Sequence, residues 1–243
     1  MMTSQRFFIE PEKIQGNEAV LNGADAHHLK NVLRLKTGDS IQLLNGSGNI
    51  FTATIKKLGK EIDLEIEDRQ DYSPVKPTIH VAQGLLKGKK MDFLIQKATE
   101  LGISSFHPFT SLHGTADTPS ANKIRRWRKI MIEACKQCGR ADFMTICDPV
   151  NFPVVLNAGD DFEEKIILWE NEPDHSLQDL GNLAAIDSIL VVIGPEGGFS
   201  YEEIDQAQKK GLRSLKMGGI TLRAESASFS VMAILQFLTG KLG

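Results

Sequence analysis

The sequence lacks a long hydrophobic run. Across 243 residues, no segment approaches the ~18 consecutive apolar residues of a membrane helix, and residues 1–12 lack the apolar core of a secretory signal peptide. Internal repeats and low-complexity segments are also absent from the sequence. The apolar content of 41% is ordinary for a globular core. We therefore expect a folded cytoplasmic protein that does not contact a membrane.

Cysteine is scarce. The three residues, Cys135, Cys138 and Cys147, are an odd number and suit a reducing compartment. Cys135 and Cys138 form a C-x-x-C, but they fall inside a predicted helix. No second C-x-x-C supplies the remaining ligands of a zinc site. We therefore expect neither a metal site nor a redox function.

The charges are unevenly distributed along the chain, although the net charge is only −3. Residues 73–140 carry 12 basic and 4 acidic side chains, whereas residues 1–72 carry 9 and 11, and residues 141–243 carry 7 and 16. A basic segment inside an acidic protein indicates a polyanionic partner. The alternative is that these basic residues form the solvated face of a helix.

Two patterns of secondary structure predict two domains. In residues 1–72, short strand-like runs alternate with turn signals, which is typical of a small β-barrel. Prolines then interrupt the pattern. From residue 73 onward strands alternate with helices, which predicts an α/β domain with a mainly parallel sheet. We expect strands at residues 6–9, 19–21, 40–44, 50–56, 62–66, 79–83, 103–109, 165–169, 189–193 and 213–217, and helices at 25–33, 91–101, 121–138, 201–210 and 226–238.

Two glycine-containing segments follow predicted strands in the last third of the chain. The first, residues 194–199 (GPEGGF), precedes a helix whose start is marked by a capping box of Ser200 and Glu203. The second is Gly218-Gly219, just ahead of an apolar helix. Because parallel strands end at the same edge of a sheet, we expect both segments to border one crevice. Their spacing matches neither the dinucleotide-binding nor the P-loop fingerprint, and a tight turn without a ligand is the alternative.

Taken together and in this order, the motifs of the chain resemble the RsmE family of 16S rRNA uridine-N3 methyltransferases, members of the knotted SPOUT class. The resemblance is carried by GPEGGF at 194–199, LRAESA at 222–227, RFF at 6–8, HHL at 27–29, VLRLK at 32–36, KG at 87–88, QKATELG at 96–102, EA at 133–134 and GR at 139–140. It implies an α/β fold with a trefoil-knotted, mainly parallel sheet covered by helices on both faces. A PUA-like β-barrel RNA-binding domain at residues 1–72 precedes this methyltransferase domain at residues 73–243.

The resemblance also implies S-adenosylmethionine as the cofactor, held by three segments that follow strands. The expected contacts are Leu168, Glu170, Gly194, Glu196, Gly198, Met217, Gly218 and Leu222. Backbone groups at strand ends suit this zwitterionic ligand, because its pocket needs little permanent charge. Glu196 either contacts the cofactor or fixes its own loop by accepting backbone N–H bonds.

Arg223 and Glu225 are the candidate catalytic residues. Methyl transfer to uracil N3 requires the N3 proton to leave, and Arg223 can stabilise the charge that spreads onto the uracil carbonyl oxygens. Glu225 either orients Arg223 or accepts the proton. The alternative is a purely structural ion pair at a helix start.

The expected partner is 16S rRNA within the small ribosomal subunit, and the resemblance implies a homodimer. Candidate RNA-binding residues are Arg6, Arg34, Lys36, Lys87 and Arg140, which are expected to contact mostly phosphates. The apolar helix at residues 229–238 supplies either a dimer interface or a buried core.

The sequence departs from the family pattern at three places, one of which is the run after Arg140, where the usual basic residue and proline are lacking. Ile220 stands where the family has Arg, and residues 110–114 (TSLHG) replace a Ser-x-Arg-Ser-like stretch. These departures leave the target nucleotide open. The alternatives are a catalytically inactive RNA-binding protein of the same fold, a methyltransferase with a different RNA target, and a binder of nucleotide phosphates that uses the glycine loop.

Overall fold

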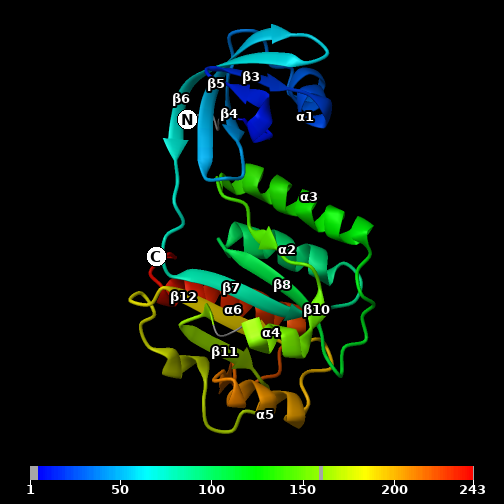
Figure 1. Ribbon diagram of the computed structural model, residues 1–243, viewed down its shortest axis with the longest axis vertical. Helices are drawn as coiled ribbons and strands as arrows, with labels where there is room; N and C mark the ends of the chain where they lie inside the picture. Colours follow the sequence, from blue (N-terminus) through cyan, green and yellow to red (C-terminus); the bar gives the residue numbers. More distant parts are fainter. Residues whose placement is uncertain (1–4, 159–160, 243) are drawn as a thin grey trace. The chain divides into compact units, whose positions relative to one another are not determined.

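The computed structural model describes residues 5–158 and 161–242, and the chain divides into two compact units (Figure 1). One unit comprises the chain up to Pro74 together with the later segment Ile132–Phe143. Its end at Pro74 lies close to the domain boundary expected between residues 72 and 73. The other unit comprises Val75–Met131 and the chain from Met144 onward. The segment Ile132–Phe143 therefore packs with the first unit, although it lies within the range expected for the second domain.

The first unit is built on a mixed six-stranded sheet in the order β1-β4-β5-β6-β3-β2. Its elements are β1 (Arg6–Phe8), β2 (Ile14–Gln15), β3 (Glu18–Leu21), α1 (Gly23–His27), the π-helical η2 (His28–Val32), β4 (Ser40–Leu44), β5 (Asn49–Leu58) and β6 (Ile62–Asp71). Burial largely alternates along β4, β5 and the first half of β6, as the period of two predicts. All six strands place side chains in or against one hydrophobic core, so the sheet curls around that core as a small barrel does.

The second unit is built on a seven-stranded sheet in which every paired strand is parallel. The strand order is β10-β8-β7-β12-β11-β13, and β9 also pairs with β8. The strands are β7 (Thr78–Gly84), β8 (Ser105–Thr110), β9 (Thr145–Ile146), β10 (Val150–Asn151), β11 (Glu164–Leu168), β12 (Ser188–Ile193) and β13 (Arg213–Leu215). The helices are α2 (Lys90–Glu100), α3 (Ala121–Cys138), α4 (Phe152–Ala158), α5 (Tyr201–Lys209) and α6 (Ala224–Leu238). The part of α3 from Ile132 onward belongs to the first unit.

Helices cover both faces of the parallel sheet, as expected (Figure 1). On one face, Ala82 and Val192 pack in a core with residues of α4 and α5. On the other face, Gln83 of β7 is hydrogen-bonded to Ser228 of α6. Neighbouring strand residues point to opposite faces, so α6 lies across the sheet from α4 and α5. Burial on both faces explains why β12 reads as a nearly continuous apolar run.

Local signals predicted most of these elements. The strand Ser40–Leu44 and the helix Ala121–Cys138 have the expected bounds, and the capping box of Ser200 and Glu203 begins α5. The short elements β9, β10 and α4 were not predicted. Two-residue strands exist only through their pairing with β8, and that pairing leaves no periodic signal in the sequence.

The trefoil knot stays a prediction. Three consecutive strands, β11, β12 and β13, take the spatial order β12-β11-β13, and β12 inserts beside β7. Such an arrangement is consistent with a knotted sheet.

None of the described helices is both long and apolar enough to span a membrane. Within the described residues, no group of three His, Cys, Asp or Glu side chains is placed to hold a metal ion.

A pair of half-buried histidines adjoins β7 and β8, away from the strand ends that carry the glycine loops. His80 Nδ1 lies 2.6 Å from Ser105 Oγ, which lies 2.5 Å from His107 Nε2. Burial, followed by the proximity of His107, lowers the pKa of His80 to about 4. Burial also lowers the pKa of His107. Both rings are therefore neutral at pH 7 in the folded protein.

We expect this histidine pair to make stability pH-dependent. Because the folded-state pKa of His80 lies below the ordinary 6.5, the unfolded chain binds protons first as the pH falls. The contribution of neutral His80 to the free energy of unfolding is therefore fully present above about pH 6.5 and is lost progressively toward pH 4. His80→Gln should reduce that loss by about 1 kcal/mol, a figure discounted for partial exposure. Urea unfolding at pH 7 and pH 4.5 measures the effect, and exposed His175→Gln should behave like the wild type.

Candidate active site

The ends of three neighbouring strands meet at one edge of the parallel sheet. Leu168, the last residue of β11, is in register with Ile193 of β12 on one side and with Leu215 of β13 on the other. Each strand runs into an irregular segment at this edge. The register of the strands therefore brings both glycine segments to the same edge of the sheet, as the sequence predicted.

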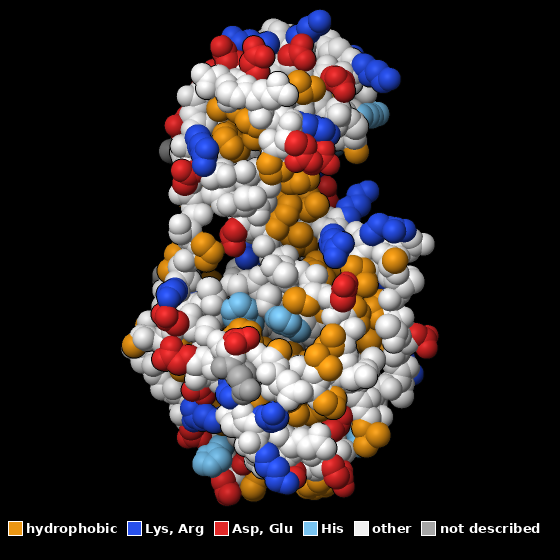
Figure 2. Space-filling view, in the orientation of Figure 1, with side chains coloured by type: hydrophobic (Ala, Val, Ile, Leu, Met, Phe, Trp, Pro, Cys, Tyr) orange, Lys and Arg blue, Asp and Glu red, His pale blue; other side chains and the backbone are white. Residues whose placement is uncertain are grey.

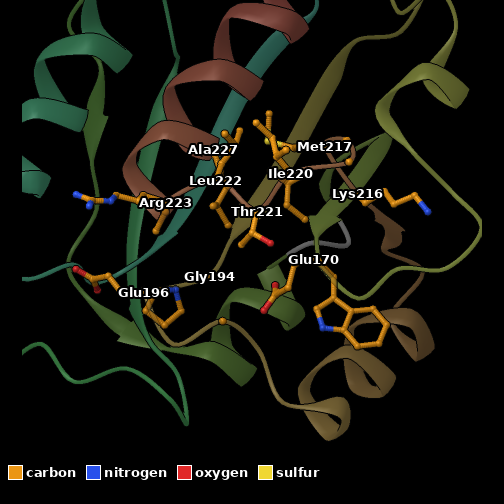
Figure 3. A pocket seen from close by; sticks show the side chains of 18 of the residues that line it. Glu170, Gly194, Glu196, Lys216, Met217, Ile220, Thr221, Leu222, Arg223 and Ala227 are labelled. Carbon is orange, nitrogen blue, oxygen red and sulfur yellow. The ribbon is translucent and has the colours of Figure 1, made fainter.

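These segments enclose a cavity of about 440 Å³ (Figure 3), within the size range of small-molecule sites. All eight expected cofactor residues line it: Leu168, Glu170, Gly194, Glu196, Gly198, Met217, Gly218 and Leu222. Figure 3 shows the 216–223 segment and the helix that follows it on one side, with Glu170 and Glu196 on the other. The cavity also contains Ile220, the position where the chain departs from the family pattern.

Glycine is required where the backbone of the first glycine loop approaches its neighbours closely. Gly198 has φ +68°, and a Cβ atom there would lie 2.6 Å from Glu170 Oε1. A Cβ on Gly197 would lie 2.7 Å from the carbonyl oxygen of His113. The segment at residues 110–114 therefore packs directly on this loop. Its departure from the family pattern therefore lies against the glycine loop, although none of these residues lines the cavity itself.

A buried hydrogen-bond network holds the loop after β12 against the sheet and α6. Gln83 Nε2 donates to the carbonyl oxygens of Gly194 at 3.1 Å and Gly84 at 2.9 Å, while its Oε1 accepts from the hydroxyl of Ser228. Gln83 and Ser228 are both fully buried. Buried polar groups must be paired to avoid a desolvation penalty, so this network fixes the loop in one position. Sequence reasoning did not identify Gln83, because its role depends entirely on tertiary contacts.

Arg223 lies at the cavity, whereas Glu225 faces a different partner. Arg223 is the N-cap residue of α6, and its exposed side chain extends toward the side of Glu196 (Figure 3). Glu225 instead forms an ion pair with Lys90 at 3.2 Å. Residues two apart at a helix start do not share a face. Among the described residues, no hydrogen bond or ion pair joins Glu225 to Arg223, so the expectation that Glu225 orients Arg223 has no support from a contact.

Glu196 fixes its own loop in the structure. Its Oε1 accepts from the backbone N–H of Lys87 at 3.2 Å and from Lys90 Nζ at 3.1 Å. Burial raises the pKa of Glu196, but hydrogen bonds from its own backbone, Lys90 and Lys87 outweigh burial and lower the pKa overall. Glu196 is therefore ionised at neutral pH.

Lys90 and Trp169 line the cavity but were missed by sequence reasoning. Lys90 belongs to α2, which comes from a distant part of the chain. The buried indole Nε1–H of Trp169 has no hydrogen-bond acceptor among the described residues. An unpaired buried donor at a cavity wall is available to a ligand. The Lys89-Lys90 pair at a predicted helix start was the one available sequence signal.

The candidate RNA-binding residues differ in their exposure and in their contacts. Arg34, Lys36 and Lys87 are exposed. Arg6 instead donates hydrogen bonds to Gln42 Oε1 and to the carbonyl oxygens of Lys136 and Gln137 near the end of α3. Arg140 is largely buried and pairs with Asp142 at 3.0 Å. Arg6 and Arg140 thus have structural contacts within the first unit.

Two family models match the chain. Residues 73–236 match an RNA methyltransferase domain, and residues 21–67 match an RNA methyltransferase PUA domain. A relative named ribosomal RNA small subunit methyltransferase E, from Buchnera aphidicola subsp. Acyrthosiphon pisum, is 31% identical over 97% of this chain and 94% of its own. The chain belongs to this methyltransferase family. The family expected from the motifs is therefore confirmed.

Solved structures agree with this family and fold. The ribosomal RNA small subunit methyltransferase E of Neisseria gonorrhoeae, bound to S-adenosyl methionine, is 28% identical with a TM-score of 0.87, covering 97% of this chain and 98% of its own. The Legionella pneumophila protein Lpg2936, solved with the cofactor SAM, is 29% identical with a TM-score of 0.86 and the same coverage. The expected fold class, a parallel methyltransferase sheet with a PUA-like unit, is confirmed.

Proposed function

We propose that this chain transfers a methyl group from S-adenosylmethionine to N3 of a uridine in 16S ribosomal RNA of the small ribosomal subunit. The observation that carries the proposal is the cavity formed by the ends of β11, β12 and β13, which contains every residue expected to hold the cofactor. Residues 1–72 would act as the PUA-like RNA-binding domain and residues 73–243 as the methyltransferase domain. A ribosomal substrate would place the protein in the cytoplasm.

The residues of the cavity fit the cofactor. Glycines allow the backbone to approach a ligand closely, and the unpaired indole N–H of Trp169 offers a donor. Leu168, Met217 and Leu222 supply apolar surface beside these polar groups. When bound, S-adenosylmethionine supplies an electrophilic methyl group on a sulfonium.

Arg223 has the position needed to handle the nucleobase. Loss of the N3 proton leaves negative charge on uracil O2 and O4, and a guanidinium can donate hydrogen bonds to such oxygens. Among the described residues, no acceptor is bound to the Arg223 side chain, so its donors are available at the cavity. Glu225 is a less direct candidate for proton acceptance, because its carboxylate pairs with Lys90.

RNA phosphates would contact exposed cations of the second unit. Arg125, Arg126, Arg128 and Lys129 are exposed on α3, and Figure 2 shows Lys and Arg side chains over this helix. On the same helix, Trp127 is fully buried and donates to Asp92 of α2 at 3.1 Å, which fixes the basic face outward. Lys87 would add a further phosphate contact beside the cavity.

We expect RNA affinity to fall steeply with salt. Each neutralised phosphate contributes a slope of about −0.7 to −0.9 to the dependence of log K on log salt. Replacing Arg125 and Arg128 with Ala should reduce the slope by about 1 to 2. Filter binding of a small-subunit RNA fragment measures this slope. The salt concentration is varied from about 50 to about 300 mM, roughly the range over which such contacts weaken. Lys209→Ala with Lys210→Ala, on the exposed end of α5, is the matched control and should leave the slope unchanged.

We also propose that the chain forms a homodimer. One side of α6 is core, because Val231, Met232 and Leu235 are fully buried, while Phe229 and Phe237 are exposed. Phe229 packs against exposed Phe93 of α2, with ring centroids 6.1 Å apart. Exposed aromatic clusters are typical of protein interfaces. The buried side of α6 is core, and its exposed aromatic residues support the proposed dimer interface.

Calorimetry with S-adenosylmethionine and with ATP tests the proposal at its first step. We expect binding of S-adenosylmethionine and no binding of ATP. The second step is incubation with small ribosomal subunits lacking the modification, followed by mapping of the methylated nucleotide. Cofactor binding without methyl transfer would favour the catalytically inactive RNA-binding alternative, and methylation elsewhere would favour a different RNA target.

A further inference from the structure

Lys90 occupies a position that local helix energetics disfavour. It is the first residue of α2, and its neighbour Lys89 is an N-cap without a side-chain hydrogen bond. Unpaired N–H groups give a helix N-terminus partial positive charge, so a second cation there is unfavourable. A tertiary partner of negative charge would offset this cost.

The compensation comes from two carboxylates on two other segments. Lys90 Nζ lies 3.1 Å from Glu196 Oε1 and 3.2 Å from Glu225 Oε2. Glu196 belongs to the loop after β12, and Glu225 to the first turn of α6. One ammonium group thus joins three segments that are distant in sequence, and all three border the same cavity edge.

The two carboxylates need this cation because they are close together. Glu196 Oε1 and Glu225 Oε2 can be no farther apart than the sum of their two distances to Lys90 Nζ. The side chains of Lys90, Glu196 and Glu225 are only 34%, 29% and 20% exposed, so water screens their charges incompletely. Without the cation, like-charge repulsion would favour protonation of one carboxylate or separation of the two segments.

We propose that Lys90 is a positioning residue of the cavity, which offsets the repulsion between Glu196 and Glu225 and keeps them adjacent, so that the glycine loop and the start of α6 keep their spacing. The glycine loop carries Gly194 and Gly198, and the start of α6 carries Arg223. Lys90 thereby links the expected cofactor contacts to the residue expected to contact the base. The proposal rests on the proposed function only in taking S-adenosylmethionine as the ligand.

The pKa values of the cluster agree with this role. Hydrogen bonds to Glu196 and then to Glu225 raise the pKa of Lys90, while partial desolvation opposes the rise. The charged groups that face Lys90 are these two carboxylates, and Lys87 adds a backbone N–H to Glu196. Lys90 and Glu196 are therefore both charged at neutral pH.

The test compares Lys90→Met with Lys90→Arg and with the control Lys89→Met. Calorimetry at pH 7 should show S-adenosylmethionine affinity weakened about tenfold or more in Lys90→Met. Lys90→Arg should recover most of the affinity, because it retains the charge and the donors. Lys89→Met removes an adjacent exposed lysine and should stay within about twofold of the wild type.

A second readout distinguishes positioning from general loss of structure. Carbon-13 NMR titration of the glutamate carboxylates should show one member of the pair titrating about one pH unit higher or more in Lys90→Met. Its cofactor affinity should then vary between about pH 5 and pH 7, where the wild type is flat. Adding Glu225→Gln to Lys90→Met removes the repulsion and should return the remaining carboxylate to an ordinary titration. If Lys90→Met does not fold, the carboxylate titration is measured on this double variant instead.

Two results would overturn the proposal: a folded Lys90→Met protein with wild-type cofactor affinity, or unchanged titration of both carboxylates. If the wild type itself fails to bind S-adenosylmethionine, the proposed function fails. The carboxylate titration still decides the role of Lys90 in that case, since it needs no ligand.

Discussion

Arg223→Ala should reduce methyl transfer to small-subunit RNA by about 10²- to 10³-fold, the cost of removing one donor that stabilises developing negative charge. Arg223 is exposed at the cavity and caps α6 without a side-chain capping bond. Its removal should therefore leave the fold and the cofactor affinity nearly unchanged. Single-turnover methylation with saturating cofactor measures the loss, and calorimetry confirms that the cofactor still binds.

The matched variant for this prediction is Arg223→Lys. It keeps the positive charge but loses the planar fork of donors, so activity should be intermediate if directed hydrogen bonds to the base matter. Lys209→Ala, on an exposed surface of α5, should have full activity. Wild-type rates in a folded Arg223→Ala protein would show that the guanidinium has no part in the reaction.

Gly84→Ala should both destabilise the protein and disable the site. A Cβ atom on Gly84 would lie 2.5 Å from the backbone nitrogen of Pro195, and a backbone atom cannot move aside as a flexible side chain can. We expect a loss of about 1–3 kcal/mol in the free energy of unfolding from this overpacking. Because the glycine loop would be displaced, methyl transfer should fall by about 10²-fold. Thermal unfolding and the methylation assay measure the two effects.

Gly219→Ala is the control for the stability measurement. Gly219 also lines the cavity, but nothing lies within 4 Å of a Cβ built there. Its melting temperature should stay close to that of the wild type. If Gly84→Ala were equally harmless, the close approach between β7 and the loop after β12 would not constrain the site.

The sequence predicted elements whose signals are local. A capping box marked the start of α5, and strong helical periodicity gave α3 its full length. It also predicted the parallel sheet, since strands alternate with helices throughout the second unit. The glycine segments at residues 194–199 and 218–219 indicated a shared crevice, because parallel strands end at a common edge.

Contacts between distant segments left no such signal. The bridge from Lys90 to Glu196 and Glu225 joins residues more than a hundred positions apart. The buried bond between Gln83 and Ser228 is of the same kind. Arg6 and Arg140 read as RNA-binding cations in the sequence, but their contacts with α3 and Asp142 become visible only in the folded first unit.

The sequence by itself determined the family, the class of fold and the segments that form the cavity, since these follow from ordered motifs, hydrophobic periodicity and capping. Tertiary structure alone decided which charged side chains are paired and which are available. Pairing depends on through-space distance, and chain order does not specify that distance. For this reason Glu225 emerged as a partner of Lys90, while Arg223 kept its donors at the cavity.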